Sequence, residues 1–198
     1  MAELDESLIR RAQMGDSDAF AAIITAYQQQ IYGLSYRFFN NYHDAEDAAQ
    51  ETIIKIYRSL ASYQGAGSFK SWIFTITANT CRDLLRKRKG RETVSYDDDE
   101  FGGGWEPVSQ CREEQPEDYA LDQQGQEVLR AAIARLPENF RVAIVMREFA
   151  QMNYEEISIA TNTSLGTVKS RINRGRKMLR EMIKQSREQE DDGIRHIG

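Results

Sequence analysis

Apolar residues recur at intervals of three and four along most of this 198-residue chain, which is the spacing of helices with one buried face. The helical period runs from Glu6 to about Arg91 and resumes from near Ala120 to about Ser186. Polar or glycine-containing breaks, and one proline, fall at residues 15–18, 40–44, 64–68 and 136–137. Strand-like alternation and internal repeats are not evident, so the sequence predicts an all-α protein.

The helical period is lost in the segment between these two stretches. Residues 96–105 read Tyr-Asp-Asp-Asp-Glu-Phe-Gly-Gly-Gly-Trp, and the acidic composition persists to about Asp118. We therefore predict two small helical domains, at residues 1–92 and 120–186, joined by a flexible acidic linker at 93–119 and followed by a frayed polar tail at 187–198. Four short helices are expected in the second domain.

The stretch from Tyr154 to Lys177 predicts two helices joined by a sharp turn. Asn162-Thr163-Ser164 supplies turn and capping chemistry between them. An inward apolar stripe is expected on the second helix, formed by Leu165, Val168, Ile172, Leu179 and Met182. The outer stripe carries cations and small polar groups: Thr167, Lys169, Ser170, Arg171, Asn173, Arg174, Arg176 and Lys177. An α-helix with such side chains fits the DNA major groove, whereas the plainer alternative is a solvated cationic helix end.

Local charge supports the DNA-binding interpretation, although the whole chain has a net charge of −5. Residues 93–122 hold ten acidic side chains and one basic one, while residues 123–186 hold eleven basic and six acidic ones. The low overall pI therefore comes from the linker. Because local charge decides which surface meets a polyanion, the second domain remains suited to DNA.

Two segments of the first domain carry further candidate chemistry. In the helix after Asp44, spacing of three and four separates an apolar stripe, Ile53, Ile56, Tyr57 and Leu60, from a polar stripe, Asp47, Gln50, Glu51 and Lys55. The polar stripe is either an acidic helix start favoured by the helix dipole or a docking face for a basic partner helix.

The second segment, residues 68–89, mixes aromatic and small polar residues and ends in a basic cluster. Aromatic and polar side chains can hold an unpaired base, and cations can hold phosphates. Trp72, Ile73 and Ile76 are expected in the core, whereas Phe69 and Asn79 are more open to a base-facing role. Arg86, Lys87 and Arg88 are candidates for phosphate contacts.

Four motifs follow one another along the chain: Asp44-Ala-Glu-Asp-Ala-Ala-Gln-Glu51, residues 69–79, Leu136 to Phe149 leading into Tyr154-Glu-Glu-Ile, and Gly166-Thr-Val-Lys-Ser-Arg171. In this order and spacing, they resemble the sigma-70 superfamily, specifically the small extracytoplasmic-function (group IV) sigma factors of the envelope-stress type. The resemblance implies promoter-specific transcription initiation without covalent chemistry by the chain itself. It also implies core RNA polymerase as a partner, through the beta-prime clamp helices and the beta flap, and an anti-sigma factor.

The resemblance assigns roles residue by residue. Asp47, Gln50 and Glu51 match the clamp-helix contact, and the loop from Gly65 to Phe69 with Asn79 matches the part that captures a flipped minus-10 base. Lys169, Ser170, Asn173 and Arg174 match minus-35 contacts, although related factors carry Arg and Phe where this chain has Lys169 and Asn173. We therefore expect this chain to recognise a different promoter sequence from those factors, with part of the recognition coming from DNA shape.

Other function classes are disfavoured by what the sequence lacks. Cys81 and Cys111 have no CxxC partner, and His43 and His196 stand alone, so a disulfide, a metal site and a cofactor are not expected. Neither a membrane-spanning run nor a signal peptide is found, which favours a cytoplasmic protein. The main alternative is a stand-alone helix-turn-helix regulator that dimerises on a palindrome.

Overall fold

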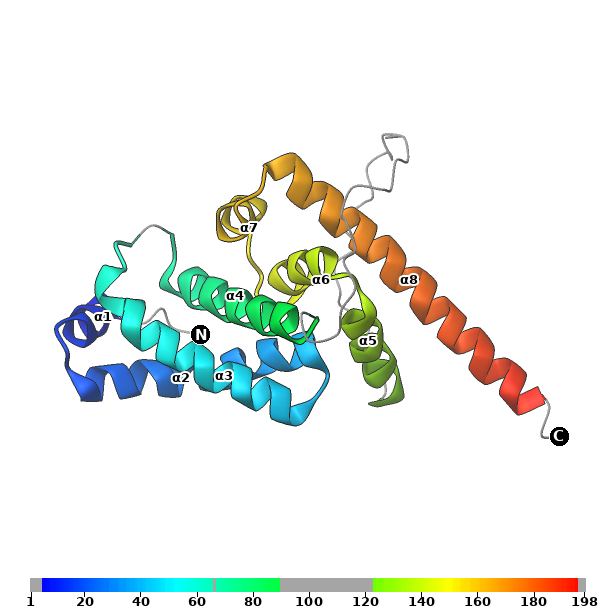
Figure 1. Cartoon of the computed structure of the whole chain (residues 1–198), viewed down its shortest axis with the longest axis horizontal. Coiled ribbons are helices and arrows are strands. Elements are labelled where there is room, and N and C mark those ends of the chain that lie inside the picture. Colours follow the sequence, from blue (N-terminus) through cyan, green and yellow to red (C-terminus); the bar gives the residue numbers. More distant parts are fainter. Residues whose placement is uncertain (1–4, 66, 90–122, 196–198) are drawn as a thin grey trace.

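The computed structural model describes residues 5–65, 67–89 and 123–195, and within these ranges every regular element is helical. This confirms the all-α prediction. The N-terminal unit consists of α1 (Glu6–Gln13), α2 (Ser17–Phe39), α3 (Tyr42–Ser59), the short 3-10 helix η1 (Leu60–Ser62) and α4 (Phe69–Lys89). Figure 1 shows α2 and α3 lying alongside one another with α4 across them.

The helix breaks follow from local capping chemistry. Asp16 caps α2 by accepting hydrogen bonds from the backbone N–H groups of Asp18 and Ala19, each at 3.0 Å. Asn40 adopts a left-handed conformation, with φ of 48°, at the end of α2, and Asn41 then caps α3 through Asp44 N–H at 3.1 Å. Polar residues at these positions therefore stop one helix and start the next, as the sequence predicts.

The core of the N-terminal unit is formed where these helices meet. Ile23 and Ile31 of α2, Ile56 of α3 and Ile73 of α4 are fully buried. Cys81 is also buried in α4, and burial raises the pKa of its thiol to about 12, so Cys81 is an unreactive thiol rather than a redox site.

The C-terminal unit consists of α5 (Gln123–Arg135), α6 (Glu138–Ile144), the π-helical turn η2 (Val145–Phe149), α7 (Tyr154–Thr161) and α8 (Leu165–Arg195). The expectation of four short helices is wrong for α8, which has 31 residues and continues beyond Ser186, where a frayed tail was predicted. Figure 1 shows its last part extending away from the other helices. An amphipathic stripe that continues through Leu179, Met182 and Ile183 keeps α8 packed on its neighbours well past the predicted recognition residues.

Several predictions concern residues outside the described ranges. The acidic linker at 93–119 is one of them, as are Cys111 and His196. Among the described helices, none is both long and apolar enough to cross a membrane. The described residues also contain no group of His, Cys, Asp or Glu side chains suited to a metal ion.

Candidate nucleic-acid interface

The turn between α7 and α8 is built by three small polar residues. Asn162 ends α7 in a left-handed conformation with φ of 51°, and Ser164 caps α8 by accepting a hydrogen bond from Thr167 N–H at 3.1 Å. At the other end of α7, Asn153 and Glu156 form a reciprocal capping box. The predicted helix-turn-helix geometry is therefore fixed by caps at both of its helices.

Helix α8 places the predicted recognition residues on its solvent side. Val168 and Ile172 are buried on the opposite side, but the prediction for Leu165 is wrong, because its first-turn position leaves it 41% exposed. The outer set contains two half-buried residues, Thr167 and Arg171, and six exposed ones: Lys169, Ser170, Asn173, Arg174, Arg176 and Lys177. Thr167 also lies 2.9 Å from Ser164, oxygen to oxygen, so it belongs partly to the cap.

Arg176 differs from its neighbours on the exposed side of α8. Its guanidinium donates two hydrogen bonds to one oxygen of Glu148, from Nε at 2.9 Å and from Nη2 at 2.7 Å. Glu148 lies in η2, so this ion pair ties α8 to the π-helical turn that follows α6. Arg176 therefore has a structural partner that Lys169 and Arg174 lack among the described residues.

Gly175 sets the distance between α8 and α6. A Cβ at this position would lie 2.7 Å from Cγ1 and 3.1 Å from Cδ1 of Ile144, and Ile144 is itself 1% exposed. Helix α8 thus approaches α6 more closely than a side chain at position 175 would allow. This close contact orients the exposed side of α8 relative to the rest of the unit.

The predicted docking stripe lies on α3. Asp47 and Gln50 are exposed and Glu51 is half-buried, and neither of the two carboxylates forms an ion pair among the described residues. Lys55, assigned to the same stripe, instead reaches Asp83 of α4, with 3.6 Å between its Nζ and Oδ2. The acidic part of the stripe is therefore free to meet a basic partner.

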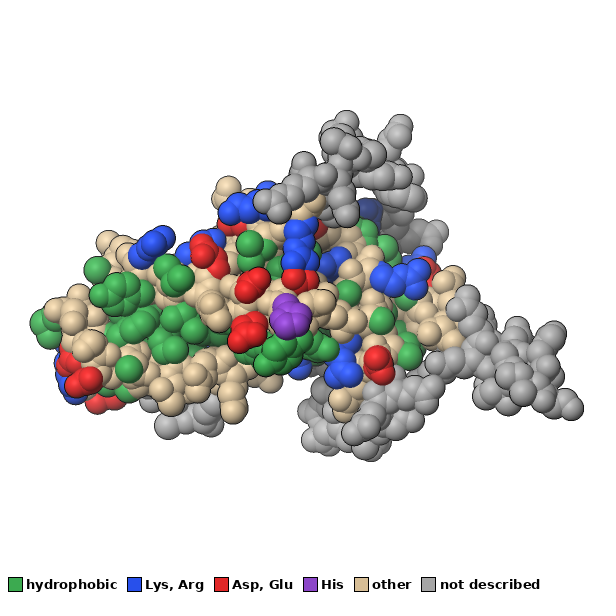
Figure 2. Space-filling model, turned by 60° about the horizontal axis from the view of Figure 1, so that its bottom comes forward, with side chains coloured by type: hydrophobic (Ala, Val, Ile, Leu, Met, Phe, Trp, Pro, Cys, Tyr) green, Lys and Arg blue, Asp and Glu red, His purple; other side chains and the backbone are tan. Residues whose placement is uncertain are grey.

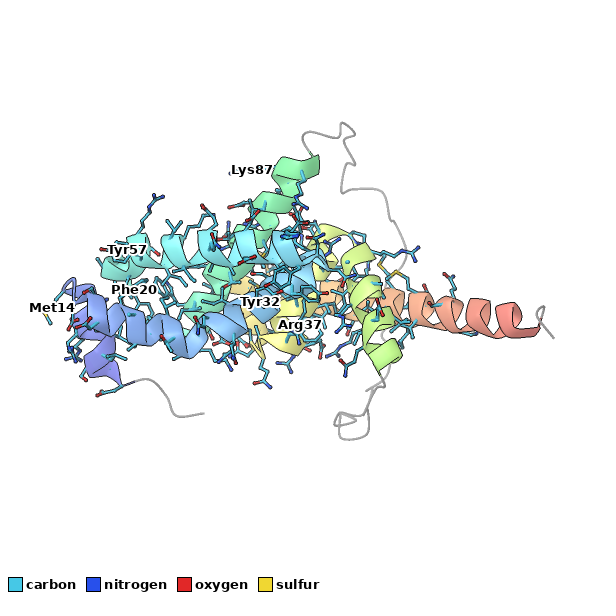
Figure 3. All side chains as sticks on the ribbon, turned by 90° about the horizontal axis from the view of Figure 1, so that it is seen from below. Met14, Phe20, Tyr32, Arg37, Tyr57 and Lys87 are labelled. Atoms are coloured by element: carbon cyan, nitrogen blue, oxygen red, sulfur yellow. The ribbon has the colours of Figure 1, made fainter. Side chains whose placement is uncertain are left out.

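The apolar stripe of α3 departs from prediction at Tyr57, which is 64% exposed. Its ring packs edge-on against Phe20 of α2, with 5.1 Å between centroids, and Figure 3 shows the two side chains on neighbouring helices. Apolar side chains gather at the α1 end of the face in Figure 2. Ile54 of α3 is also exposed, at 43%. The surface of α3 thus changes from acidic to apolar along its length.

The expectation that Phe69 is more open than Trp72 is wrong. Phe69 is 8% exposed and packs against Tyr27, Tyr63 and Trp72, with ring centroids 5.1 to 6.2 Å apart, whereas Trp72 is only half-buried. The loop before α4 turns Phe69 back into the bundle, and this contact with three aromatic rings outweighs exposure at the helix start. Ile73 is buried as expected, and Ile76 and Asn79 are half-buried.

The basic end of α4 is already partly paired. Arg88 forms a two-pronged ion pair with Asp44, which lowers the pKa of that carboxyl, and lies over the Phe39 ring. Arg86 pairs with Glu138 of α6, with 2.8 Å between Nε and Oε1. Lys87 is exposed, and Figure 3 shows it near the far end of α4. Of the three predicted phosphate contacts, Lys87 alone has no ion pair among the described residues.

Comparison with known families agrees with this two-part geometry. Residues 23–91 match sigma-70 region 2, and residues 126–179 match sigma-70 region 4. The chain belongs to the sigma-70 family of RNA polymerase sigma factors. Its sequence relatives further define the group as that of the extracytoplasmic-function (ECF) factors, as the resemblance implied.

Two similar proteins match over nearly their whole length. The RNA polymerase sigma-H factor of Pseudomonas aeruginosa is 36% identical over 180 residues, which cover 89% of this chain and 92% of that protein. The ECF RNA polymerase sigma factor SigW of Bacillus subtilis is 35% identical, with 89% and 95% covered.

A solved structure shares the fold. CnrH, in complex with the cytosolic domain of CnrY, matches with a TM-score of 0.64 and 20% identity, covering 91% of this chain and 97% of that chain. The fold of both units therefore has a precedent in one chain.

Proposed function

We propose that this sigma factor binds core RNA polymerase through Asp47, Gln50 and Glu51 and reads a promoter through both of its units. The observation that carries the proposal is the presence, in one chain, of an exposed acidic face on α3 and an exposed basic recognition helix, α8. A stand-alone regulator needs a basic DNA-binding helix such as α8, but it does not need an acidic docking face such as that on α3. The beta-prime clamp helices are the proposed partner of α3, and the beta flap is the proposed partner of the C-terminal unit.

The proposed minus-35 interface is the outer side of α8. Lys169 and Asn173 are exposed four residues apart, so they project from adjacent turns on the same side of the helix, and Arg174 is exposed next to Asn173. Ser170, Thr167 and Arg171 flank them, with Thr167 more suited to backbone contacts because it shares the cap with Ser164.

The proposed minus-10 interface lies on α4. Asn79 is half-buried, and its amide can donate and accept hydrogen bonds at a base edge. Lys87 is available for phosphate contacts in this conformation. Arg86 requires release from Glu138, and the Phe69 ring is suited to supporting Trp72 and Tyr63 rather than to stacking on a base.

Further proposals concern partners and location. The sigma factor RpoE of Bartonella quintana, solved in complex with the anti-sigma factor NepR, matches this fold at a TM-score of 0.61, with 22% identity over 83% of this chain and 96% of that chain. We propose an anti-sigma factor for this chain as well. A role at RNA polymerase places its action in the cytoplasm, and bond formation is left to the polymerase.

Reconstituted transcription tests the function directly. Core RNA polymerase and this protein, combined with a genomic promoter library, should give discrete transcript 5′ ends preceded by two shared sequence motifs. If no transcripts depend on the protein and core binding also fails, the stand-alone regulator becomes the better interpretation.

Arg174→Ala is expected to weaken minus-35 duplex binding, because the exposed guanidinium has no partner among the described side chains and is free for DNA. The loss should be about 1 to 3 kcal/mol if Arg174 contacts a base, and it should be larger for specific than for random duplexes. Fluorescence anisotropy at several salt concentrations measures the affinity for the specific and the random duplex. Unchanged affinity for both duplexes would remove Arg174 from the interface.

A further inference from the structure

A recess of about 360 Å³ lies where α2, α4 and η2 meet, and none of its lining residues belongs to α3 or α8. Helix α2 supplies most of the lining from one side, including Gln29 and Arg37. Lys70 and Phe74 of α4 and Phe149 of η2 complete it. Pockets for small molecules typically measure about 300 to 1,000 Å³, so a recess of this size suits a small ligand.

The guanidinium of Arg37 is held in one orientation at this recess. Its Nη1 donates to the carbonyl oxygen of Gly33, one turn earlier, at 2.8 Å, and its central carbon lies 4.3 Å from the centroid of the Phe149 ring. A Cβ on Gly33 would lie 3.3 Å from Nη1, so glycine at this position makes room for the group. Figure 3 shows Arg37 on the side of α2 that faces the C-terminal unit. The backbone thus fixes one nitrogen of a fork that has further N–H groups to donate.

The charge of Arg37 is not compensated by a carboxylate. Arg37 is half-buried, and among the residues that the structure describes it forms no ion pair, nor do Lys70 and Arg130. Burial lowers the pKa of Arg37, and the nearby cation Arg130 of α5 lowers it further. An unpaired, half-buried charge next to a like charge destabilises the ligand-free protein. An anion bound between these side chains would relieve both effects.

Lys70 supplies a cation from the opposite wall of the recess. Its Nζ lies 5.6 Å from the centroid of the Phe74 ring, and Phe74 is itself buried, so the side chain rests on the bundle. A guanidinium matches two oxygens of one phosphate group, and an ammonium binds phosphate as a point charge. Gln29 is exposed and adds an amide that can hydrogen-bond to an uncharged part of a ligand.

We propose that this recess binds a small organic phosphate, which Arg37 and Lys70 hold directly and Arg130 attracts. A phosphate monoester carries roughly two negative charges at neutral pH, so it answers several uncompensated cations better than a single carboxylate does. Proteins hold a nucleic-acid strand in a groove that follows its backbone, whereas this recess is confined between three helical elements. The inference concerns the chain by itself and does not depend on the proposed polymerase and promoter contacts.

The test measures ligand binding by the full-length protein, with inorganic pyrophosphate as the probe and the ionic strength kept constant with sodium chloride. Pyrophosphate should raise the Tm, because a ligand that binds only the folded state stabilises it. Lys70→Gln should weaken pyrophosphate binding about tenfold or more in isothermal titration calorimetry, the scale of one hydrogen bond between charged groups. AMP and glucose 6-phosphate, titrated in the same way, distinguish a nucleotide from a sugar phosphate as the source of the phosphate.

The matched control is Arg180→Gln, which removes the same charge from an exposed position of α8 outside the recess and should bind pyrophosphate as the unsubstituted chain does. Gly33→Ala changes no charge, but its Cβ crowds Arg37 Nη1, so this variant should also bind pyrophosphate more weakly. Arg130→Gln should raise the Tm of the ligand-free protein by removing a repulsion. The further rise in Tm on adding pyrophosphate should then be smaller.

Equal pyrophosphate affinities for Lys70→Gln and Arg180→Gln would overturn the proposal, since binding would then follow net charge alone. An unchanged Tm with pyrophosphate, AMP and glucose 6-phosphate would overturn it as well. If these three ligands fail and a 12-nucleotide thymidine oligomer binds with an affinity that Lys70→Gln lowers, the recess belongs to a DNA-binding surface instead.

Discussion

Core RNA polymerase is expected to bind the Asp47→Ala/Glu51→Ala double variant at least about thirtyfold more weakly than the unsubstituted chain. Both carboxylates lie on the outer stripe of α3 and have no ion-pair partner among the described residues, so their charge is available to a basic partner helix. Truncating one member of a buried, hydrogen-bonded interfacial charge pair costs about 2 to 5 kcal/mol, and each 1.4 kcal/mol is about a tenfold change in affinity. Competition binding against a labelled sigma factor measures the change.

The matched control for this variant is Asp18→Ala/Glu127→Ala. It removes the same two charges from exposed positions on α2 and α5, away from the α3 stripe. Binding of minus-35 duplex should be the same in both variants, because neither changes α8. Equal polymerase affinity for the two double variants would show that α3 contributes only net charge, and the docking assignment would then be abandoned.

The elements that could be predicted from sequence are those determined by local chemistry. Two helix starts, at Asn41 and Ser164, depend on hydrogen bonds to backbone groups within three residues. The turn at Asn162 is also local, so all three can be recognised from neighbouring residues in the sequence. The outer side of α8 follows from the positions of Val168 and Ile172. These features need no knowledge of distant parts of the chain.

The features that the sequence did not predict depend on distant contacts. Phe69 is buried because Tyr27, Tyr63 and Trp72 surround it, and no spacing rule places these rings together. Arg86 pairs with Glu138, which is 52 residues away, so a basic cluster that looked free for DNA has a partner in the other unit. Glu138 lies in the first turn of α6, where an acidic residue is also favoured by the helix dipole alone. Nothing in the local sequence shows that it pairs with Arg86 instead.

Gly175→Val is expected to have the largest effect on stability, at more than about 3 kcal/mol. A Cβ alone would lie 2.7 Å from Ile144 Cγ1, and two further methyl groups would have to enter the space between α8 and α6. Overpacking a core typically costs about 1 to 3 kcal/mol. The closest atom belongs to a buried, β-branched side chain, which cannot rotate away freely. Denaturant unfolding followed by circular dichroism measures the loss, and minus-35 duplex binding should fall with it because α6 orients the recognition helix.

Two further variants separate crowding from other effects of replacing a helical glycine. Gly166→Ala, in the same helix, places its Cβ 3.8 Å from Ser164 Oγ, an ordinary contact, and should stabilise by up to about 1 kcal/mol through helix propensity. Gly175→Ala combined with Ile144→Ala removes both crowding atoms, so the pair should cost less than the sum of its single substitutions. Strict additivity in this pair, or a Gly175→Val protein as stable as the unsubstituted one, would mean that α8 and α6 adjust their separation freely and that Gly175 does not fix the recognition helix.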